Sequence, residues 1–180
     1  MPQSSAPELL QSQALTWYRS LEPIKPAEMI GLWTGAGIAS GHPLDGVLEN
    51  LQWFGKHFHP DMRADALLFQ FRHDRLVPIN PSFIPIRAAI RFASFGKTTV
   101  ARNWFSYLQQ AVRAKGTTAS LSLLRFDGAE TAAMIYDRQP IIDYFRRISE
   151  DEVAGMMVVQ ADDRRYFFKL RRAALEKAAG

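Results

Sequence analysis

The sequence predicts a mainly β chain, of the α+β class, that folds into a single antiparallel β-barrel with flanking helices. Three observations lead to this prediction. The last third of the chain is a series of short apolar strands separated by turn residues. The chain has 180 residues, the size of one domain, and 47% of them are hydrophobic, which is enough for a substantial core. Consecutive antiparallel strands hide their edges when they close, and a barrel of about eight strands can hold one small ligand.

Two helices are expected beside the barrel. Residues 6–20 place apolar side chains at helical spacing, and Pro23 and Pro26 end that helix and form a linker. The second helix is inserted near residues 98–114, before Gly116. Its predicted apolar stripe is Val100, Trp104, Phe105, Leu108, Ala111 and Val112. Spacing also predicts a short helix over 44–53, irregular chain over 57–62 and a terminal helix over 173–179.

The strands are read from apolar runs bounded by Gly, Pro, Asn and Asp. They are expected at 29–38, 66–71, 76–79, 120–126, 131–136, 141–148, 153–160 and 165–172. The segment 141–148 is ambiguous between strand and helix, and a strand is favoured there. Asp127-Gly128 is a hairpin turn in this scheme, and Tyr166, Phe168 and Leu170 share one face of the last strand. The domain organisation is then a helix and linker over 1–24, one barrel domain over 25–172 and a tail over 173–180.

Charge and composition exclude several classes of protein. The 22 basic residues outnumber the 18 acidic ones, but most lie beside an acid, so no basic stripe for nucleic acid emerges. The chain has no cysteine, no apolar run long enough for a membrane span and no signal-peptide pattern, so a cytoplasmic protein is expected. A P-loop, a dinucleotide fingerprint and a GxSxG motif are all missing, so no cofactor is predicted. The oligomeric state stays open, a homodimer included.

The region from residue 31 to residue 56 is the most informative part of the chain. Five glycines fall within the sixteen residues 31–46, a density that favours tight turns or close backbone approach. Aromatic residues here and in later strands are the predicted walls of a ligand pocket, although such residues more often form core. These ligand-binding candidates are Trp33, Trp53, Phe54, Phe69, Tyr136 and Phe168.

Four residues are candidates for acid chemistry in that pocket. His42 and Asp45 share one Gly- and Pro-rich turn, where one of them could protonate or orient a ligand oxygen. The alternative is that Asp45 caps the following helix and His42 bonds to backbone. Asp143 lies between apolar neighbours in a strand and is either a buried proton donor or the surface partner of a nearby arginine. Asp137 is the fourth candidate, and its alternative role is to start a turn.

A metal site is not predicted. His57 and His59 are two residues apart, which would place both on one side of an extended segment. No third ligand stands at a supporting spacing in the sequence, so surface or packing roles are the preferred interpretation.

Several segments resemble a known pair of protein regions. Gly31-Leu32-Trp33-Thr34-Gly35 matches the pattern that names the GXWXG domain. Three later segments, 132–141, 143–146 and 167–172, resemble the domain of unknown function DUF4334 that usually follows it. The resemblance implies a bacterial-type soluble protein, with a GXWXG part at 25–80 and a DUF4334 part at 117–172. It also suggests ring-opening of a bicyclic terpene oxide, an activity associated with a member of this family.

A more distant likeness is to the lipocalin and fatty-acid-binding barrels, in which a Gly-x-Trp opens the first strand and a late basic residue packs across the Trp. This likeness implies structural roles for Gly31 and Gly35, and it pairs Arg171 or Arg172 with Trp33. The glycine pattern also resembles nitrobindin-like haem barrels. Those take their haem histidine from late in the chain, whereas all four histidines here lie in the first half.

The leading hypothesis is therefore an internal pocket for a small hydrophobic ligand that carries one or two oxygens, such as a terpenoid. It includes a cofactor-free lyase or isomerase, in which an acid protonates a strained oxide and aromatic walls shield the developing cation. The alternatives are a carrier without catalysis and a haem-binding barrel.

Overall fold

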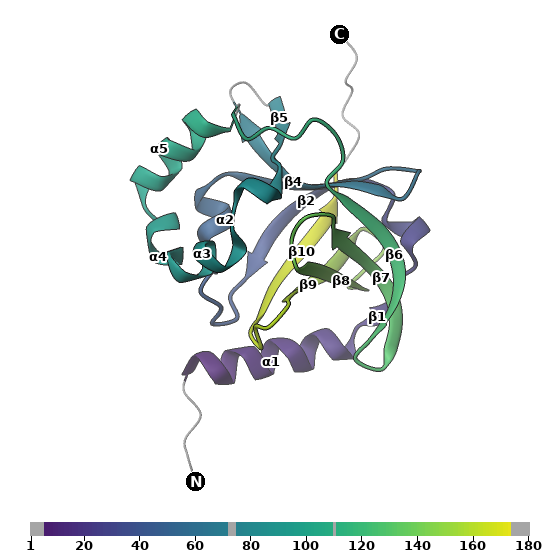
Figure 1. The fold of residues 1–180 in the computed structure, drawn as a ribbon. Coiled ribbons are helices and arrows are strands. Elements are labelled where there is room, and N and C mark those ends of the chain that lie inside the picture. Colours follow the sequence, from purple (N-terminus) through teal and green to yellow (C-terminus); the bar gives the residue numbers. More distant parts are fainter. Residues whose placement is uncertain (1–5, 72–74, 110, 174–180) are drawn as a thin grey trace.

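The structure, a computed structural model, describes residues 6–71, 75–109 and 111–173. Its centre is a closed antiparallel barrel with the strand order β8-β7-β6-β4-β3-β2-β10-β9, in which β9 pairs with β8 to complete the ring (Figure 1). The barrel strands are β2 (Gly31–Ile38), β3 (Trp53–Phe58), β4 (Arg63–Phe71), β6 (Ala119–Phe126), β7 (Ala129–Tyr136), β8 (Ile141–Arg147), β9 (Glu152–Val159) and β10 (Arg165–Arg172). The predicted antiparallel barrel is confirmed.

Two short strands extend this ring. The strand β1 (Glu22–Pro23) pairs with β8, and β5 (Arg75–Pro78) pairs with β4. The hairpin between β6 and β7 turns at Asp127 and Gly128, both of which have positive φ, as the two-residue turn predicted there requires.

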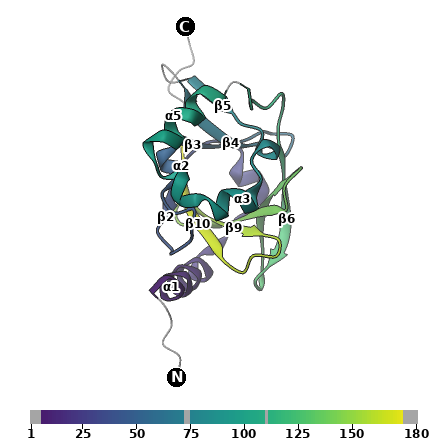
Figure 2. The same ribbon diagram turned by 60° about the vertical axis from the view of Figure 1, so that its left-hand side comes forward.

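The helices lie on two sides of the barrel (Figures 1 and 2). The long helix α1 (Ala6–Ser20) runs along one side, over the same residues that the sequence predicted. Short helices gather on the other side. They are α2 (Val47–Asn50), α3 (Ile86–Arg91), α4 (Ala93–Gly96) and α5 (Thr99–Leu108). Of the two 3-10 turns, η2 (Pro81–Phe83) directly precedes α3, whereas η1 (Pro26–Met29) packs against β6 and β7. None of the described helices is long and apolar enough to cross a bilayer.

Two apolar layers hold these parts together. The larger layer fills the barrel and includes Trp33, Phe58, Phe145 and Phe168, all of them almost fully buried. The smaller one lies between α1 and the outside of the sheet. There Tyr18 packs on Phe167, with their ring centroids 6.1 Å apart. Successive residues of β10 thus serve different layers, because side chains of a strand alternate between its two faces.

The predictions for the segment after β2 differ from the structure. A helix was predicted over 44–53, but α2 covers only four residues, because Gly46 before it and Gln52 after it both have left-handed backbone with φ of 80° and 63°. Irregular chain was predicted over 57–62, whereas β3 already runs to Phe58. Part of the predicted terminal helix over 173–179 lies outside the described residues.

The predicted inserted helix is present, but it is shorter than predicted and a different side of it is buried. It is α5, and it ends at Leu108. Its buried side carries Ala101 and Phe105, whose ring lies 4.7 Å from that of Phe69 in β4. The predicted stripe is wrong for Val100, Trp104 and Leu108, which are exposed, and Ala111 and Val112 lie beyond the end of the helix. The contact with the barrel needs only one turn of this short helix. The buried side is therefore set by packing against the barrel and not by the spacing of apolar residues along the whole segment.

A single glycine allows β3 to pass β2. Gly55 has a φ of 151°, and a Cβ placed on it would lie 1.9 Å from the carbonyl oxygen of Trp33. The pairing of β3 with β4 is also irregular on both sides of Gly55. This residue therefore sets which side chains of β3 point into the barrel.

We predict that Gly55→Ala lowers the free energy of unfolding by roughly 3 kcal/mol or more, because the methyl group collides with backbone and L-residues disfavour this φ. Gly116→Ala is the matched control, since a Cβ there meets nothing within 4 Å and Gly116 lacks a left-handed φ. Urea unfolding followed by circular dichroism measures both. Equal stability of the two variants would contradict this role of Gly55.

Candidate functional site

A buried ion pair spans the inside of the barrel. Lys56 lies on β3 and Asp143 on β8, two strands that are not neighbours in the sheet. The distance from Lys56 Nζ to Asp143 Oδ2 is 2.9 Å, and their side chains are only 2% and 1% exposed. Charges are seldom buried this deeply unless they are paired, and removing one partner is strongly destabilising.

Two further groups complete this polar cluster. Lys56 Nζ also donates to the Ala66 carbonyl of β4 at 2.9 Å and to the Tyr136 hydroxyl of β7 at 3.3 Å. The Tyr136 hydroxyl in turn donates to Asp143 Oδ2 at 3.4 Å. The other carboxylate oxygen, Asp143 Oδ1, is buried and has no partner among the described residues. We call Lys56, Tyr136 and Asp143 the interior triad.

Aromatic rings surround the charge of Lys56. Its Nζ lies 5.7 Å from the ring centre of Trp53, 5.6 Å from that of Tyr136 and 5.2 Å from that of Phe168. Burial lowers the pKa of Lys56, while the charge and hydrogen bond of Asp143 oppose that shift. Burial also raises the pKa of Tyr136 well above its usual value, and Asp143 acts in the same direction, so the phenol keeps its proton.

The interior triad lies in the wall of a cavity of about 130 Å³ between the barrel interior and the helices α2, α3 and α5. Its other lining residues are nearly all apolar or aromatic. They include Leu44, Val47, Leu48, Leu51, Leu67, Ile84, Ile86, Phe105, Ile141 and Met157. The hydroxyl of Tyr166, also in this wall, is buried without a partner among the described residues. A mainly apolar cavity with a few convergent polar groups is the usual form of a small-molecule site.

A larger open depression of about 380 Å³ lies between the segments around Asn80, Arg113 and Asp137, and it shares Pro81 and Tyr136 with the lining of the interior cavity. Most of its other lining residues lie in loops, and it contains no fully buried charge. The interior cavity is the better candidate because its polar groups are shielded from water and held in place by several strands.

Five of the residues predicted from the sequence lie at this cavity. Asp143, Tyr136, Trp53, Phe69 and Phe168 all line it. Phe54 does not line the cavity, although the sequence placed it among the pocket walls. Lys56 is the member of the site that sequence reasoning missed. Lys56 stands two residues before the core residue Phe58, so in a strand both side chains point inward. This could not be inferred from the sequence because no strand was predicted there.

Trp33 belongs to the framework. It is fully buried, its indole N–H donates to the Met29 carbonyl at 2.7 Å, and it does not line the cavity. The guanidinium of Arg172 lies 4.3 Å from its ring centre, so the predicted cation over the indole is confirmed for Arg172. Arg171 pairs with Glu152 at the surface instead.

The glycines of the same motif have steric roles. Gly35 leaves room for a pocket wall, because a Cβ on it would lie 2.3 Å from the ring of Trp53. Gly31 has a φ of 123° and lies beside the guanidinium of Arg172.

His42 and Asp45 share a structural turn, and neither lines the cavity, although Leu44 between them does. Asp45 Oδ2 accepts the backbone N–H groups of Ser40, Gly41 and His42 at 2.8–3.1 Å, so it anchors the turn and does not cap α2. His42 Nδ1 accepts from the Leu44 N–H at 3.1 Å, and its ring packs 5.7 Å from that of Tyr166. Burial, assisted by the charge of Arg164, lowers the pKa of His42 to about 4.

Asp137 is next to Tyr136 in the sequence but is not part of the interior site. It lies at the surface in an ion pair with Arg63, and its carboxylate does not line the interior cavity. Of the four predicted acid candidates, only Asp143 is therefore in place to meet a ligand inside the barrel.

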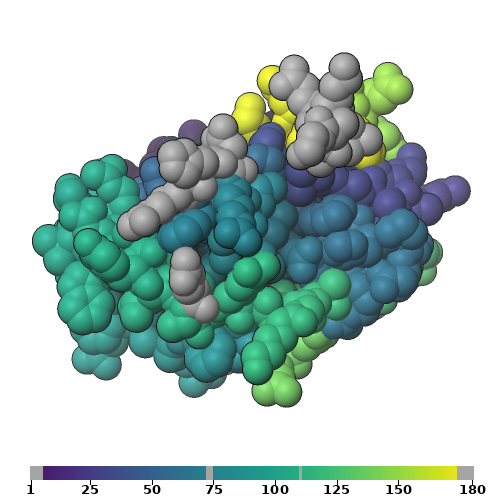
Figure 3. Space-filling view, turned by 90° about the horizontal axis from the view of Figure 1, so that it is seen from above, coloured from purple at the N-terminus to yellow at the C-terminus, as the bar shows by residue number. Residues whose placement is uncertain are grey.

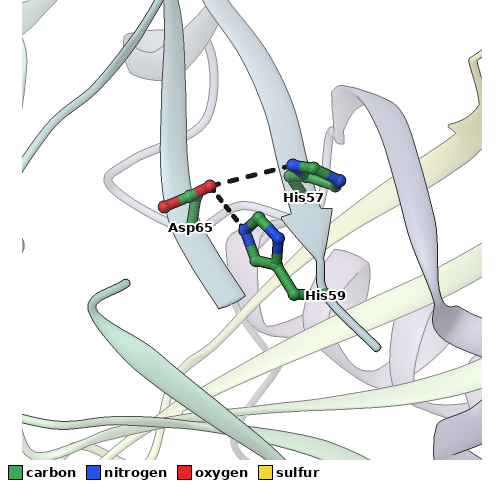
Figure 4. Close-up of side chains that lie close together, drawn as sticks. All are labelled: His57, His59 and Asp65. Atoms are coloured by element: carbon green, nitrogen blue, oxygen red, sulfur yellow. Dashed lines mark hydrogen bonds and ion pairs between the residues drawn. The ribbon is translucent and has the colours of Figure 1, made fainter. Parts of the chain in front are cut away.

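His57 and His59 lie on the outside of the barrel, where β4 brings Asp65 beside them (Figure 4). The sequence did not suggest this third residue, because strand pairing and not sequence spacing places it opposite His57. No described histidine lines the interior cavity, and His73 lies outside the described residues.

The closed antiparallel barrel with an internal, mainly apolar cavity puts the chain among the calycin-like β-barrel proteins. Residues 16–74 match the GXWXG protein family and residues 117–172 match the domain of unknown function DUF4334, so the chain belongs to the GXWXG/DUF4334 proteins. Among proteins with curated descriptions, none matches this chain.

A crystal structure of a protein from Thermomonospora curvata is similar to this chain, with 26% sequence identity and a TM-score of 0.67. The similarity covers 91% of this chain and 88% of that one. It therefore includes the barrel and the helices beside it.

We predict that Lys56→Met alone costs about 3–5 kcal/mol of unfolding free energy, because it leaves the charge of Asp143 buried without a partner. Lys56→Met combined with Asp143→Leu should cost much less than the sum of the two single changes. Urea unfolding of all four proteins in a double-mutant cycle measures this coupling. Additive effects, or single variants within about 0.5 kcal/mol of the parent, would show that the pair is not energetically coupled.

Proposed function

We propose that this protein binds a small, mostly apolar molecule inside the barrel and recognises an oxygen of that molecule with the interior triad. The observation that carries the proposal is that Asp143, whose buried Oδ1 has no partner among the described residues, is one of the few polar residues lining an otherwise apolar cavity. Buried polar atoms are almost always hydrogen-bonded, so an unpaired carboxylate oxygen in a cavity-lining residue favours a ligand that donates to it.

The cavity also limits the ligand. Its volume of about 130 Å³ is close to that of an engineered cavity of about 150 Å³ that binds benzene, so it suits a molecule of about one ring. Tyr136 can donate to a ligand oxygen, and Asp143 can accept from a ligand hydroxyl. Larger terpenoids would need the helices α3 and α5, which form one side of the cavity, to move outward.

A second candidate function is cofactor-free isomerisation of a strained cyclic ether. It is favoured by the rings of Trp53 and Phe168, which already surround one cation and could stabilise a carbocation that forms beside them. The apolar walls would exclude the water that would otherwise convert such a cation to a diol.

In this reaction the interior triad supplies and takes back every proton that moves. The Tyr136 phenol gives its proton to the ether oxygen as one carbon–oxygen bond breaks, and positive charge develops on that carbon. Asp143 Oδ1 then takes a proton from the neighbouring carbon, and a double bond forms. The product is an allylic alcohol, and rotation of the Asp143 carboxyl group returns the proton from Oδ1 to Tyr136, whose hydroxyl bonds to the same carboxylate. Lys56 keeps its charge and stabilises both anionic partners.

A carrier without catalysis would use the same cavity and remains a distinct alternative. The haem alternative has no support at the cavity, because no described histidine lines it.

We predict that the protein binds cyclohexanol more tightly than methylcyclohexane, a hydrocarbon of similar size, because only the alcohol satisfies the interior triad. In Asp143→Asn protein that circular dichroism shows to be folded, this preference should fall by about tenfold, since a hydrogen bond to a charged group is replaced by a neutral one. Native mass spectrometry of the purified protein with each compound measures the difference. Asp137→Asn is the matched control, because that carboxylate lies outside the cavity. If the alcohol shows no preference in the parent protein, the proposed recognition is wrong.

Incubation with cyclohexene oxide separates the enzyme from the carrier. Formation of 2-cyclohexen-1-ol by the parent and the Asp137→Asn variant, and its loss in Asp143→Asn and Tyr136→Phe, would support the isomerase. Binding without any product would assign the site to a carrier, and gas chromatography distinguishes the two outcomes.

A further inference from the structure

The outside of β3 and β4 carries a cluster that the proposed function does not use. His57 points outward from β3, His59 follows the end of that strand, and Asp65 stands opposite His57 on β4 (Figure 4). Asp65 Oδ2 lies 2.9 Å from His59 Nε2 and 3.8 Å from His57 Nδ1. The two imidazole rings are 4.1 Å apart.

The spacing of these three groups is close to that of a metal site. One ligand atom from each residue lies within 4.8 Å of the other two. Zinc bonds to nitrogen and oxygen are about 2.0–2.2 Å long, so tetrahedral ligands stand about 3.3 Å apart. Small side-chain rotations would therefore bring all three atoms onto one ion without any change in the backbone.

Exposure and ligand type indicate which ion would bind. The three side chains are 38%, 30% and 17% exposed, so an ion can enter and keep water at its remaining position. Two imidazoles and one carboxylate suit zinc and similar first-row divalent metals, whereas calcium and magnesium prefer oxygen ligands only.

We propose that His57, His59 and Asp65 form a surface binding site for a divalent transition metal of the zinc type. The ion would link β3 to β4 at the position where His57 and Asp65 pair. The neighbours of these two ligands, Lys56 and Ala66, share a hydrogen bond on the inner side of the same strands. The site therefore holds together the strand pair that positions Lys56.

The test is calorimetric titration of zinc chloride into the full-length protein after removal of metals with a chelator. The parent protein should bind one ion per chain, and Asp65→Asn and His59→Gln should each lower the affinity at least tenfold. Asp163→Asn, which removes an exposed carboxylate elsewhere, is the matched control and should bind zinc as the parent does. Cobalt provides a second measurement, because its visible absorption reports the number and geometry of its ligands.

Several results would overturn the metal proposal. One is zinc binding that is unchanged in Asp65→Asn and His59→Gln, and another is no binding at all by the parent. Equal competition by magnesium would also overturn it. All variants are at the surface, and circular dichroism of each confirms that a loss of binding is not a loss of fold.

A second, independent observation concerns the helices α3, α4 and α5. Between residues 75 and 126 the chain has eight basic residues and no acidic residue. Four of these basic residues are exposed on or between these helices, together with large aromatic side chains. This surface, which we call the cationic aromatic face, comprises Phe83, Arg87, Arg91, Phe92, Phe95, Lys97, Arg102, Trp104 and Tyr107.

The face protrudes at one end of the molecule, where the teal and green atoms of these helices form the left side of the space-filling view (Figure 3). Trp104 is 64% exposed and Tyr107 is 81% exposed, values unusual for such large rings. Two of these helices, α3 and α5, also line the cavity, through Ile86, Ala89 and Phe105.

We infer that the cationic aromatic face docks on an anionic lipid surface. Exposed aromatic rings insert at the boundary between headgroups and acyl chains, and basic side chains among them attract anionic headgroups. Charge complementarity favours this partner because no acidic side chain lies in the segment. Docking there would place the cavity beside a source of apolar molecules.

Co-sedimentation with vesicles tests this inference. The protein should bind phosphatidylcholine vesicles that contain phosphatidylserine and not pure phosphatidylcholine vesicles, and salt should weaken the binding. Arg91→Gln with Arg102→Gln, and separately Trp104→Ala, should each reduce binding roughly fivefold or more. Lys169→Gln, an exposed cation on β10, is the control.

Equal binding to neutral vesicles, or no binding at low salt, would overturn the docking inference. A concentration-dependent dimer that Trp104→Ala disrupts, without vesicle binding, would also overturn it and assign the face to a second copy of the chain.

Discussion

The ion pair between Lys56 and Asp143 constrains much of the rest of this structure. Two opposite charges inside an apolar barrel are tolerated only when each keeps its partners, so β3, β4, β7 and β8 must all stay in register around them. Closure of the ring between β8 and β9 keeps Asp143 away from water. The same arrangement leaves one oxygen of the cavity-lining Asp143 without a partner among the described residues, so the strongest constraint on the fold is also the main chemical feature of the proposed site.

The packing around Trp33 and Gly35 explains the GXWXG motif in steric terms. The tryptophan itself is framework, held between the Met29 carbonyl and the guanidinium of Arg172. Gly35 makes room for a second tryptophan, Trp53, which is a wall of the cavity. A motif at the start of the barrel thus positions a residue of the ligand site without contributing its own side chain to that site.

The two faces of the barrel wall have separate roles. On the inner side of β3 and β4, Lys56 joins the interior triad and bonds to the Ala66 carbonyl. On the outer side, His57 and Asp65 of the same strands, with His59 after β3, form the histidine and aspartate cluster. This division follows from the alternation of side chains along a strand, which places neighbours in sequence on opposite sides of the wall. A change at the outer surface of β3 and β4 can therefore affect the cavity, because each outward residue is joined by the backbone to an inward neighbour.

The sequence by itself determined the fold class, α1 and the hairpins of the last third, because apolar periodicity and turn residues such as Asp127-Gly128 act locally. It also singled out Asp143, Tyr136, Trp53, Phe69 and Phe168 through their residue types and apolar surroundings. Only the tertiary structure decided that Lys56 faces Asp143 across the barrel, that Asp65 joins His57 and His59, and that Asp45 anchors a turn. The physical reason is that these contacts depend on strand order and register, and a single irregular residue, Gly55, decides which side chains of β3 face inward.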